Sequence, residues 1–321
     1  MEKRKESKVI GETPPVNAGK PPWLTRRALT AEVWQQMKSM LDSLSLATIC
    51  EEAECPNIGE CFRQHTATFL ILGRTCTRDC RFCAVDHGQP KPVDPEEPQH
   101  LVDAVRQLGL RHAVITSVTR DDLRDRGAAH FAACIRAVHS GTSATVEVLV
   151  PDFQGEEAAL RTVLEAQPEV LGHNVEVVPR LYPEIRSRAN YERSLHLLQR
   201  AKELRPSTYT KSGLMVGMGE QEQEVIDVMR DLCAVACDFL TIGQYLRPSP
   251  QHYPVIDYVT PAIFGYYGQV AQDMGFRGVL CGPFVRSSYC ASALLDSVQS
   301  ELQSTSRGNH RNKRCGEYST P

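Results

Sequence analysis

Along most of the chain, short apolar runs alternate with longer segments in which apolar residues recur at helical spacing. The run at 69–73 consists of apolar residues followed by glycine, as expected of a parallel strand buried on both faces. Similar runs lie at 112–117, 145–150, 170–175, 211–217 and 239–243, and the helical segments lie at 97–108, 128–139, 155–166, 190–204 and 222–235. The pattern predicts an α/β fold of six strands in parallel β/α units, forming a full or partial barrel or a doubly wound sheet.

The two ends of the chain lack this alternation. Residues 1–25 combine prolines and charges with few apolar side chains, which predicts a flexible segment. A helical pattern at 31–46 leads to the first cysteines, and the basic stretch 307–314 is expected to be disordered. The predicted divisions are a flexible segment 1–25, an N-terminal extension 26–64, a barrel-like domain 65–284 and a C-terminal extension 285–321.

Polar residues follow several of the predicted strands at the points where the strands end. They are Thr116 to Asp122, Asn174, Glu176, and Gly217 to Glu220. In parallel α/β folds, functional groups gather at the carboxyl ends of the strands. We therefore expect these residues to line one common mouth.

Six of the twelve cysteines lie between positions 50 and 83, in two triplets. The first is Cys50, Cys55 and Cys61, and the second is Cys76, Cys80 and Cys83. The second triplet comes directly after the first predicted strand, which places it at the same mouth. Four-iron clusters normally take four cysteine thiolates, so a triplet leaves one iron open to another ligand. The spacing therefore indicates iron-sulfur chemistry at an open iron.

Two other uses of the cysteines stay open at this point. A structural zinc site needs a fourth ligand, and His65 and His87 are close in sequence. A disulfide framework is typical of short secreted chains, whereas residues 1–8 show no features of a secretory signal. We therefore expect a reducing, cytoplasmic setting. The remaining cysteines are Cys134, Cys233 and Cys237, interpreted as core residues with the last two on a helix, and Cys281, Cys290 and Cys315, which have no partner at cluster spacing.

The overall charge and hydropathy argue against two classes of partner. The formal net charge is -3, so no overall basic field would attract nucleic acid. No stretch approaches the roughly 20 apolar residues of a membrane span. We expect neither a nucleic acid nor a membrane as a partner.

The second cysteine triplet, with Phe82 just before Cys83, closely resembles that of the radical S-adenosylmethionine enzymes. The resemblance implies a partial (β/α)6 TIM-like barrel. It also implies a four-iron cluster whose open iron is chelated by the amino and carboxylate groups of S-adenosylmethionine. The reduced cluster then cleaves the sulfonium to give a 5'-deoxyadenosyl radical.

From about Trp23 to Ala291 the chain resembles the lipoyl synthase family. The stretches that carry this resemblance are 50–61, 118–123, 174–179, 210–220 and 282–289. The resemblance implies that the first triplet and Ser288 hold an auxiliary four-iron cluster, with Arg286 beside it. In this family the auxiliary cluster donates sulfur and is consumed, while two S-adenosylmethionine molecules support sulfur insertion at C6 and C8 of an octanoyl group on a carrier lysine.

The family also suggests which residues contact S-adenosylmethionine. Thr116, Ser117 and Thr119 are candidates for its methionyl end, and Gly213 and Gly217 for close backbone approach to its adenine. Further candidate cofactor-binding residues are Phe82, Asn174 and Glu176.

The implied partners are octanoylated lipoyl carrier domains, namely 2-oxoacid dehydrogenase E2 subunits and the glycine cleavage carrier protein. An electron donor such as ferredoxin or flavodoxin and an iron-sulfur carrier are also implied. The cations that we expect to meet an acidic carrier are Lys20, Arg26, Arg27 and Arg186. Two competing interpretations are a two-cluster methylthiotransferase acting on tRNA, which would need a basic RNA-binding module, and a non-enzymatic iron-sulfur scaffold or electron carrier.

Overall fold

The fold is a curved sheet of eight strands in the order β1 to β8, seen in a computed structural model. The model describes residues 19–25, 35, 38–39, 41–44, 46–52, 55, 57–63 and 67–306. The strands are β1 (Ala47–Thr48), β2 (Thr68–Ile71), β3 (His112–Ser117), β4 (Thr145–Leu149), β5 (Val170–Gly172), β6 (Tyr209–Val216), β7 (Phe239–Gln244) and β8 (Gly278–Gly282). From β2 to β8 all neighbouring strands are parallel, and β1 pairs antiparallel with β2. The chain is thus a partial TIM-like barrel.

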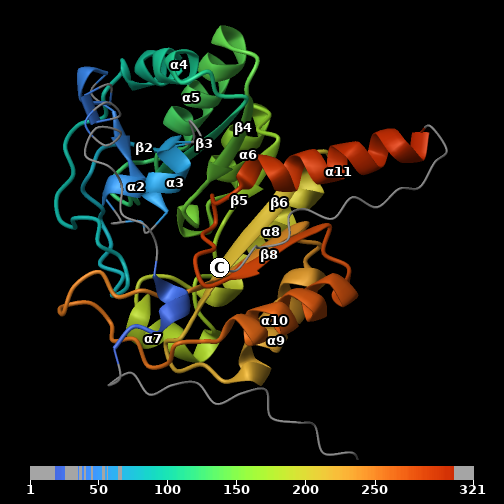
Figure 1. The fold of residues 1–321 in the computed structure, drawn as a ribbon. Helices are drawn as coiled ribbons and strands as arrows, with labels where there is room; N and C mark the ends of the chain where they lie inside the picture. Colours follow the sequence, from blue (N-terminus) through green and yellow to red (C-terminus); the bar gives the residue numbers. More distant parts are fainter. Residues whose placement is uncertain are drawn as a thin grey trace, which may run out of the picture.

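Helices follow most of the strands and cover the outer face of the sheet (Figure 1). The α-helices are α2 (Ile49–Glu52), α3 (Ile58–Arg63), α4 (Glu97–Gln107), α5 (Ala128–Gly141), α6 (Glu157–Glu165), α7 (Tyr182–Ile185), α8 (Tyr191–Leu204), α9 (Glu222–Ala234), α10 (Pro261–Met274) and α11 (Ala291–Ser306). The 3-10 turns are η2 (Pro22–Leu24), η3 (Phe153–Gly155) and η4 (Pro179–Leu181). Within the described residues, no helix is both long and apolar enough to span a bilayer.

The sequence pattern predicted the middle of this fold well and its edges poorly. All six predicted strands and all five predicted helical segments are confirmed. The count of six strands is too low, because β1 has only two residues and β8 was not recognised. Helices α10 and α11 were also not predicted, although α10 has clear boundaries. Its cap is Thr260, whose hydroxyl accepts from the Ile263 amide, and it ends at Gly275 with φ +96°.

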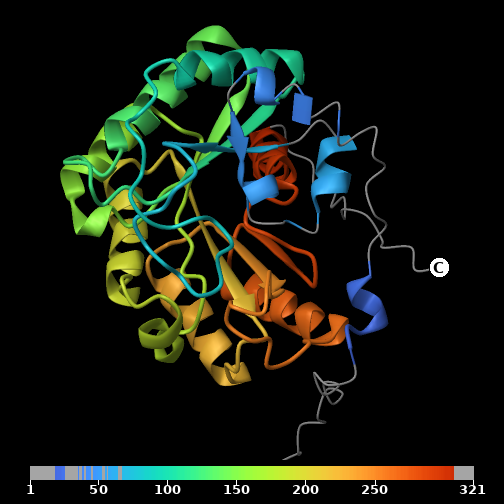
Figure 2. The same ribbon diagram turned by 90° about the vertical axis from the view of Figure 1, so that its left-hand side faces the viewer.

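Helix α11 closes the end of the barrel where the strands begin. Its buried side chains Leu294, Leu295 and Val298 pack against Val170 and Phe239, the first residues of β5 and β7. In Figure 2 this helix is seen nearly end-on within the curve of the strands. The mouth formed by the carboxyl ends of the strands therefore lies on the opposite side from α11.

The N-terminal predictions are only partly within the described residues. Half of the predicted helix at 31–46 lies outside them, as do residues 1–18 of the predicted flexible segment. Residues 19–25 are described, and there η2 buries Leu24, which is 6% exposed. At this end of the segment, Leu24 therefore packs on the fold.

The cysteines assigned to the core are largely where they were predicted. Cys134 and Cys237 are buried, and Cys233 lies on α9 with its Sγ donating to the Met274 carbonyl at 3.2 Å. Cys237 is not on a helix, because α9 ends at Ala234. Cys315 lies outside the described residues.

Candidate active site

A cavity of about 490 Å³ opens at the carboxyl ends of the strands. This volume is typical of small-molecule sites. The second cysteine triplet borders it, together with residues that follow β3, β5 and β7 and residues within β6. The predicted residues among its walls are Cys76, Cys80, Phe82, Cys83, Thr116, Ser117, Thr119, Asn174, Glu176, Gly213 and Arg286. The structure thus brings together residues that the sequence placed at three strand ends, namely the second triplet, Thr116 to Thr119, and Asn174 with Glu176, whereas the predicted Gly217 to Glu220 do not line the cavity.

The loop that carries the second triplet is fixed to the loop after β3. The Thr77 amide donates to the Thr119 carbonyl at 3.0 Å, and the Thr77 hydroxyl donates to the same carbonyl at 2.9 Å. Two backbone amides point at the sulfur of Cys76, from Arg78 at 3.4 Å and from Thr119 at 3.3 Å. These two contacts fix the position of the Cys76 sulfur.

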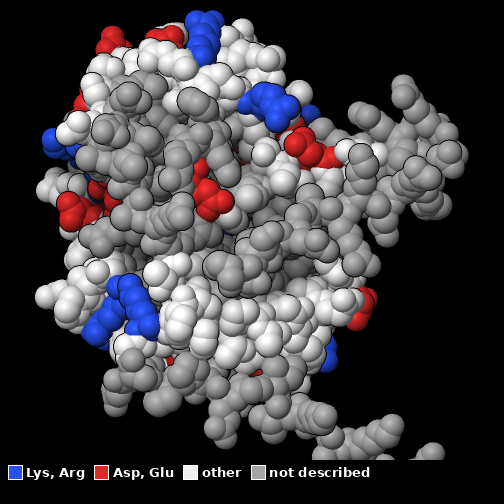
Figure 3. Space-filling view, in the orientation of Figure 1, with Lys and Arg blue, Asp and Glu red and all other residues white. Residues whose placement is uncertain are grey.

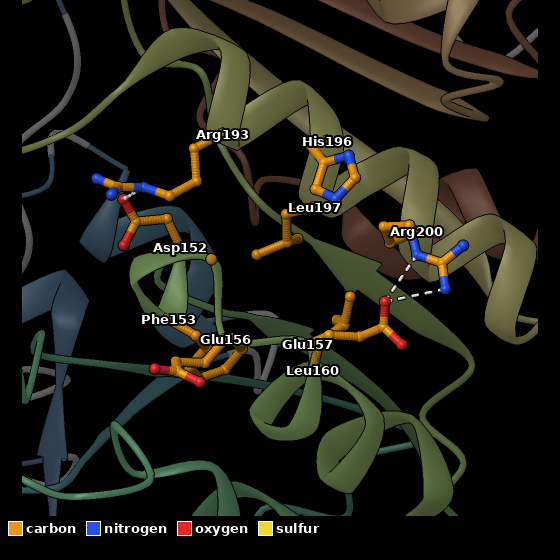
Figure 4. A pocket seen from close by; sticks show the side chains of 10 residues that line it. Asp152, Phe153, Glu156, Glu157, Leu160, Arg193, His196, Leu197 and Arg200 are labelled. Atoms are coloured by element: carbon orange, nitrogen blue, oxygen red, sulfur yellow. Dashed lines mark hydrogen bonds and ion pairs between the residues drawn. The ribbon is translucent and has the colours of Figure 1, made fainter.

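Arg78, inside the second triplet, anchors the loop through a buried ion-pair network. Its guanidinium donates to Asp121 at 2.7 and 2.9 Å and to Asp152 at 2.7 Å. Asp152 also accepts from Arg193 of α8 at 2.9 Å, and this pair is visible in Figure 4. Burial by itself would raise the pKa of Asp152, but the hydrogen bonds and charge of Arg78 outweigh burial and lower the pKa to about 2. The loop is therefore tied to η3 and α8 by charges that have little access to water.

Replacing Arg78 by alanine should destabilise the protein strongly, because Asp152 would stay buried with a weaker set of partners. The expected loss in the free energy of unfolding is roughly 3 kcal/mol or more. The pKa of Asp152 falls from 3.8 to about 2 on folding, so its contribution is present above pH about 4 and is lost as the pH falls toward 2. Arg78→Ala should flatten this acid dependence.

Chemical denaturation across this pH range measures both effects. Arg161→Ala is the matched control, since Arg161 pairs with Glu157 on the surface, where both side chains are about half exposed. It should cost about 0.5 kcal/mol or less. Equal losses for the two variants would contradict the anchoring role of Arg78.

The hollow shown in Figure 4 lies away from the triplets, between η3, α6 and α8. Its volume is about 20 Å³, close to that of one water molecule. Surface ion pairs such as Arg200 with Glu157 border it. It is too small for a cofactor or substrate.

Arg186 faces the interior and not the carrier side, which corrects its prediction as a docking cation. Its Nη1 donates to the carbonyls of Asn174 and Val175 at 3.2 and 2.9 Å, and to the Tyr182 hydroxyl at 3.1 Å. Burial raises the pKa of the Cys80 thiol, and the charge of Arg186 acts against that rise. Arg186 thus places a positive charge beside Cys80 of the second triplet. Arg26 and Arg27 lie outside the described residues, whereas Lys20 is exposed and lines the cavity.

Two polar atoms in the cavity wall are buried without a hydrogen-bond partner among the described residues. They are the hydroxyl of Ser117 and Oδ1 of Asn174. Buried polar atoms are nearly always paired in folded proteins, so these two indicate a polar ligand. Thr116 differs, because its hydroxyl donates to the Leu149 carbonyl at 2.9 Å and is satisfied by the backbone.

The two predicted glycines have different surroundings. Gly213 lines the cavity, and a Cβ there would lie 2.8 Å from Oδ1 of Asn174. Gly217 is not among the lining residues. Its φ is +98°, and a Cβ would lie 2.1 Å from the Gln244 side chain. The need for glycine at 217 therefore comes from the turn and from contacts within the protein.

A second, much smaller hollow lies beside the first triplet. Its walls are Cys50, Cys55, Asn57, Cys61, Ala67, Thr68, Arg286, Ser288 and Tyr289. Burial raises the pKa of the Cys50 thiol to about 12, with the negative charge of Cys55 adding to the effect. Oδ1 of Asn57, a residue only 1% exposed, has no partner within the described part of the chain. The thiols and this orphaned oxygen are suited to a metal-containing ligand.

Two hydrogen bonds hold the C-terminal segment against the first triplet. The Asn57 side chain donates to the Phe284 carbonyl at 2.6 Å, and the Tyr289 hydroxyl donates to Glu60 at 3.1 Å. The adjacent serines consequently face different spaces. Ser287 lines the large cavity, Ser288 lines the small hollow, and Arg286 borders both.

The sequence analysis missed one wall of the large cavity. Tyr245, Leu246, Arg247 and Pro248 line it and follow β7 directly. The strand-end argument applied to the other strands would have found them. Met215 and Thr241 also line the cavity, but they lie within β6 and β7, so the strand-end argument could not have identified them.

The second triplet borders a cavity of about 490 Å³, far larger than a single ion requires, whereas the hollow beside the first triplet is only about 10 Å³. Within the described residues, no three His, Cys, Asp or Glu side chains converge as ligands of one metal ion. His87 is exposed, and the Cys76 backbone pairs with it through an isolated bridge, while His65 lies outside the described residues. At the second triplet, the size of the cavity favours a cluster over a single zinc ion.

A three-cysteine loop at the mouth of a partial barrel defines the class of the chain. The model of the radical SAM superfamily matches residues 70–232, which include this loop and strands β3 to β6. The chain is 56% identical to a lipoyl synthase of Caldanaerobacter subterraneus, over 85% of this chain and 95% of that protein. A lipoyl synthase of Aquifex aeolicus is 54% identical, over 80% and 93% of the two chains. The chain therefore belongs to the lipoyl synthase family.

Solved structures agree on the fold. Methylornithine synthase superposes with a TM-score of 0.51 at 14% identity, covering 75% of this chain and 82% of that one. SuiB of Streptococcus suis, crystallised with S-adenosylmethionine, also gives 0.51, at 8% identity and covering 75% and 52%. At such identities the likeness concerns the barrel alone.

Proposed function

We propose that this chain inserts two sulfur atoms, at C6 and C8, into an octanoyl group linked to a lysine of a carrier domain. The observation that carries the proposal is the pair of thiol triplets beside adjoining spaces that share Arg286. An octanoyl group bound between the two triplets would meet a radical source on one side and a sulfur source on the other. General acid-base catalysis transfers acidic protons to or from a side chain. An alkyl C–H bond has no acidic proton, so acid-base groups alone cannot activate it.

Cys76, Cys80 and Cys83 are the proposed ligands of a four-iron cluster that binds S-adenosylmethionine at its open iron. When bound, this pair supplies a 5'-deoxyadenosyl radical that abstracts hydrogen. The protein contributes binding and placement. The orphaned Ser117 hydroxyl and Asn174 Oδ1 are suited to the polar groups of S-adenosylmethionine, with Thr119 and Glu176 nearby in the same wall.

Cys50, Cys55, Cys61 and Ser288 are the proposed ligands of a second, auxiliary four-iron cluster that donates sulfur. Ser288 fits this role because it lines the hollow of the first triplet while Ser287 does not. Serine oxygen is a harder ligand than thiolate and binds iron less firmly. A weakly held iron suits a cluster that gives up its sulfur.

The proposed protein substrates are octanoylated lipoyl domains of 2-oxoacid dehydrogenase E2 subunits and the glycine cleavage carrier protein. Lys20, at the cavity rim, is the described cation placed to meet an acidic carrier. An electron donor such as ferredoxin or flavodoxin and an iron-sulfur carrier that restores the auxiliary cluster complete the scheme. The chemistry needs reduced thiols, which suits the cytoplasm.

The second candidate function, methylthiolation of tRNA, would require a surface that attracts RNA. On the face in Figure 3 the described Lys and Arg side chains form small separate groups interspersed with acidic ones. The formal net charge of -3 gives no general attraction for a polyanion. A non-enzymatic scaffold would not need the large cavity, whose wall contains the unpaired Ser117 hydroxyl and Asn174 Oδ1.

The reconstituted enzyme should convert an octanoylated lysyl peptide to the dithiolated product, with a free octanoylated carrier domain competing and bulk tRNA not. The measurement is mass spectrometry of the peptide in anaerobic turnover with S-adenosylmethionine and a reductant. Inhibition by tRNA comparable to that by the carrier domain would favour the methylthiotransferase. Product without S-adenosylmethionine would contradict both enzymatic proposals.

A further inference from the structure

The loop that carries the second triplet is held by two different parts of the fold. Its first half is fixed to the loop after β3. Its second half, which ends at Cys83, lies between α7 and the segment that follows β7. The Arg81 amide donates to the carbonyl of Ile185 in α7 at 3.0 Å, and the Tyr253 amide donates to the Arg81 carbonyl at 2.8 Å. The segment after β7 is therefore part of the support of the triplet.

His252, in this segment, contacts a triplet cysteine directly. Its Nε2 lies 3.0 Å from the carbonyl oxygen of Cys83. Because a carbonyl oxygen can only accept a hydrogen bond, Nε2 carries the hydrogen and donates it. Within the described residues, no backbone amide donates to this carbonyl. The imidazole of His252 is thus the group that satisfies it.

The imidazole is itself held in place by its own segment. Its Nδ1 lies 2.8 Å from the hydroxyl oxygen of Ser249. The His252 amide donates to the Ser249 carbonyl at 3.1 Å, and Nε of Arg247 donates to the His252 carbonyl at 2.9 Å. A side chain that is fixed by its neighbours can in turn fix the group that it contacts. The ring is therefore preorganised toward Cys83.

His252 acts on Cys83 from outside the large cavity. Cys83 and the two residues after it line the cavity, as do Tyr245 to Pro248 at the start of the same segment, whereas His252 is not among the lining residues. Inside the triplet, the Cys83 amide donates to the Cys80 carbonyl at 3.0 Å, which closes a turn. The hydrogen bond from His252 ties this turn to the rest of the protein.

We propose that His252 is a positioning residue that holds Cys83 in place for the four-iron cluster of the second triplet. Three thiolates can bind one cluster only if their spacing matches it, and partners that orient the ligands strengthen metal binding. Losing the hydrogen bond should let the turn from Cys80 to Cys83 move, which loosens part of the ligand set. The inference rests on the proposed function, because it assumes that the second triplet holds this cluster.

The test compares two substitutions of similar size in the full chain. His252→Gln keeps an N–H donor at about the reach of Nε2, whereas His252→Met has no donor. His196→Met is the matched control, because His196 is an exposed histidine of α8 beside the small hollow of Figure 4. In every chain Cys50, Cys55 and Cys61 are also replaced by alanine, so that only the second triplet can hold a cluster.

Two readouts are used. The first is hydrogen exchange of residues 80–85 before reconstitution, and the second is the rate at which a chelator removes iron after anaerobic reconstitution. His252→Met should exchange the amides of Arg81 and Cys83 faster, and it should lose iron about 10-fold faster than the parent, as expected when an outer partner of a ligand is removed. His252→Gln and His196→Met should stay close to the parent in both readouts.

Three results would contradict the proposals in different ways. Equal exchange and iron release for His252→Met and the parent would overturn the role of His252 alone. Equal losses for His252→Gln and His252→Met would also overturn it, since packing and not the donor would then be responsible. A parent that binds no cluster would overturn the proposed ligand set, whereas the exchange readout needs no cluster and still decides whether His252 holds the loop.

Discussion

Replacing Cys76, Cys80 and Cys83 together by alanine should abolish cleavage of S-adenosylmethionine while leaving one cluster in place. The three thiols lie in one loop at the barrel mouth, and that loop is separate from the hollow beside the first triplet. The reconstituted variant should contain roughly four irons per chain where the unmodified protein contains roughly eight. Iron and sulfide analysis with quantification of 5'-deoxyadenosine measures both consequences.

Cys233→Ala is the control for this experiment. Cys233 is also a half-buried cysteine, but its sulfur bonds the Met274 carbonyl on the outside of the barrel. It should keep both clusters and the full rate of 5'-deoxyadenosine formation. Wild-type 5'-deoxyadenosine from the triple variant would mean that the radical cluster lies elsewhere.

Cys55→Ala should separate radical formation from sulfur insertion. Cys55 lines only the small hollow, so the large cavity and its thiols are untouched. The variant should still form 5'-deoxyadenosine, with the radical uncoupled from product. Thiolated peptide should fall by more than about 100-fold, since losing a direct ligand costs more than losing an outer partner.

Single-turnover mass spectrometry of the octanoylated peptide, without added sulfide, gives the answer for Cys55→Ala. The same preparation is assayed for 5'-deoxyadenosine, so that loss of folding is distinguished from loss of the sulfur donor. Thiolated product at the unmodified level would remove the first triplet from the role of donor. Loss of both activities would show that the two sites are coupled structurally.

Local patterns determined much of the fold and the identity of the thiols. Buried parallel strands appear as apolar runs, and this made β3, at His112–Ser117, recognisable to the residue. The same strand-end logic predicted that Cys76, Asn174 and Glu176 share one mouth, and all three line the large cavity. Strands at the edge of the sheet were not predicted because their apolar runs are too short to recognise, as in β1, which has only two residues.

Only the tertiary structure decided how distant segments meet. Asn57 and Phe284 are 227 positions apart, and their hydrogen bond sets which serine faces which space. Sequence analysis also could not place Arg186 beside Cys80, because this pair has no characteristic spacing.

The sequence by itself therefore determined the chemical class of this protein, through thiol spacing and strand periodicity, which are properties of neighbouring residues. The tertiary structure alone decided that Ser287 faces the large cavity and Ser288 the hollow beside the first triplet. The physical reason is that such contacts depend on how the chain packs as a whole: hydrogen bonds join α3 and the residue before it to Phe284 and Tyr289, segments that no local pattern connects.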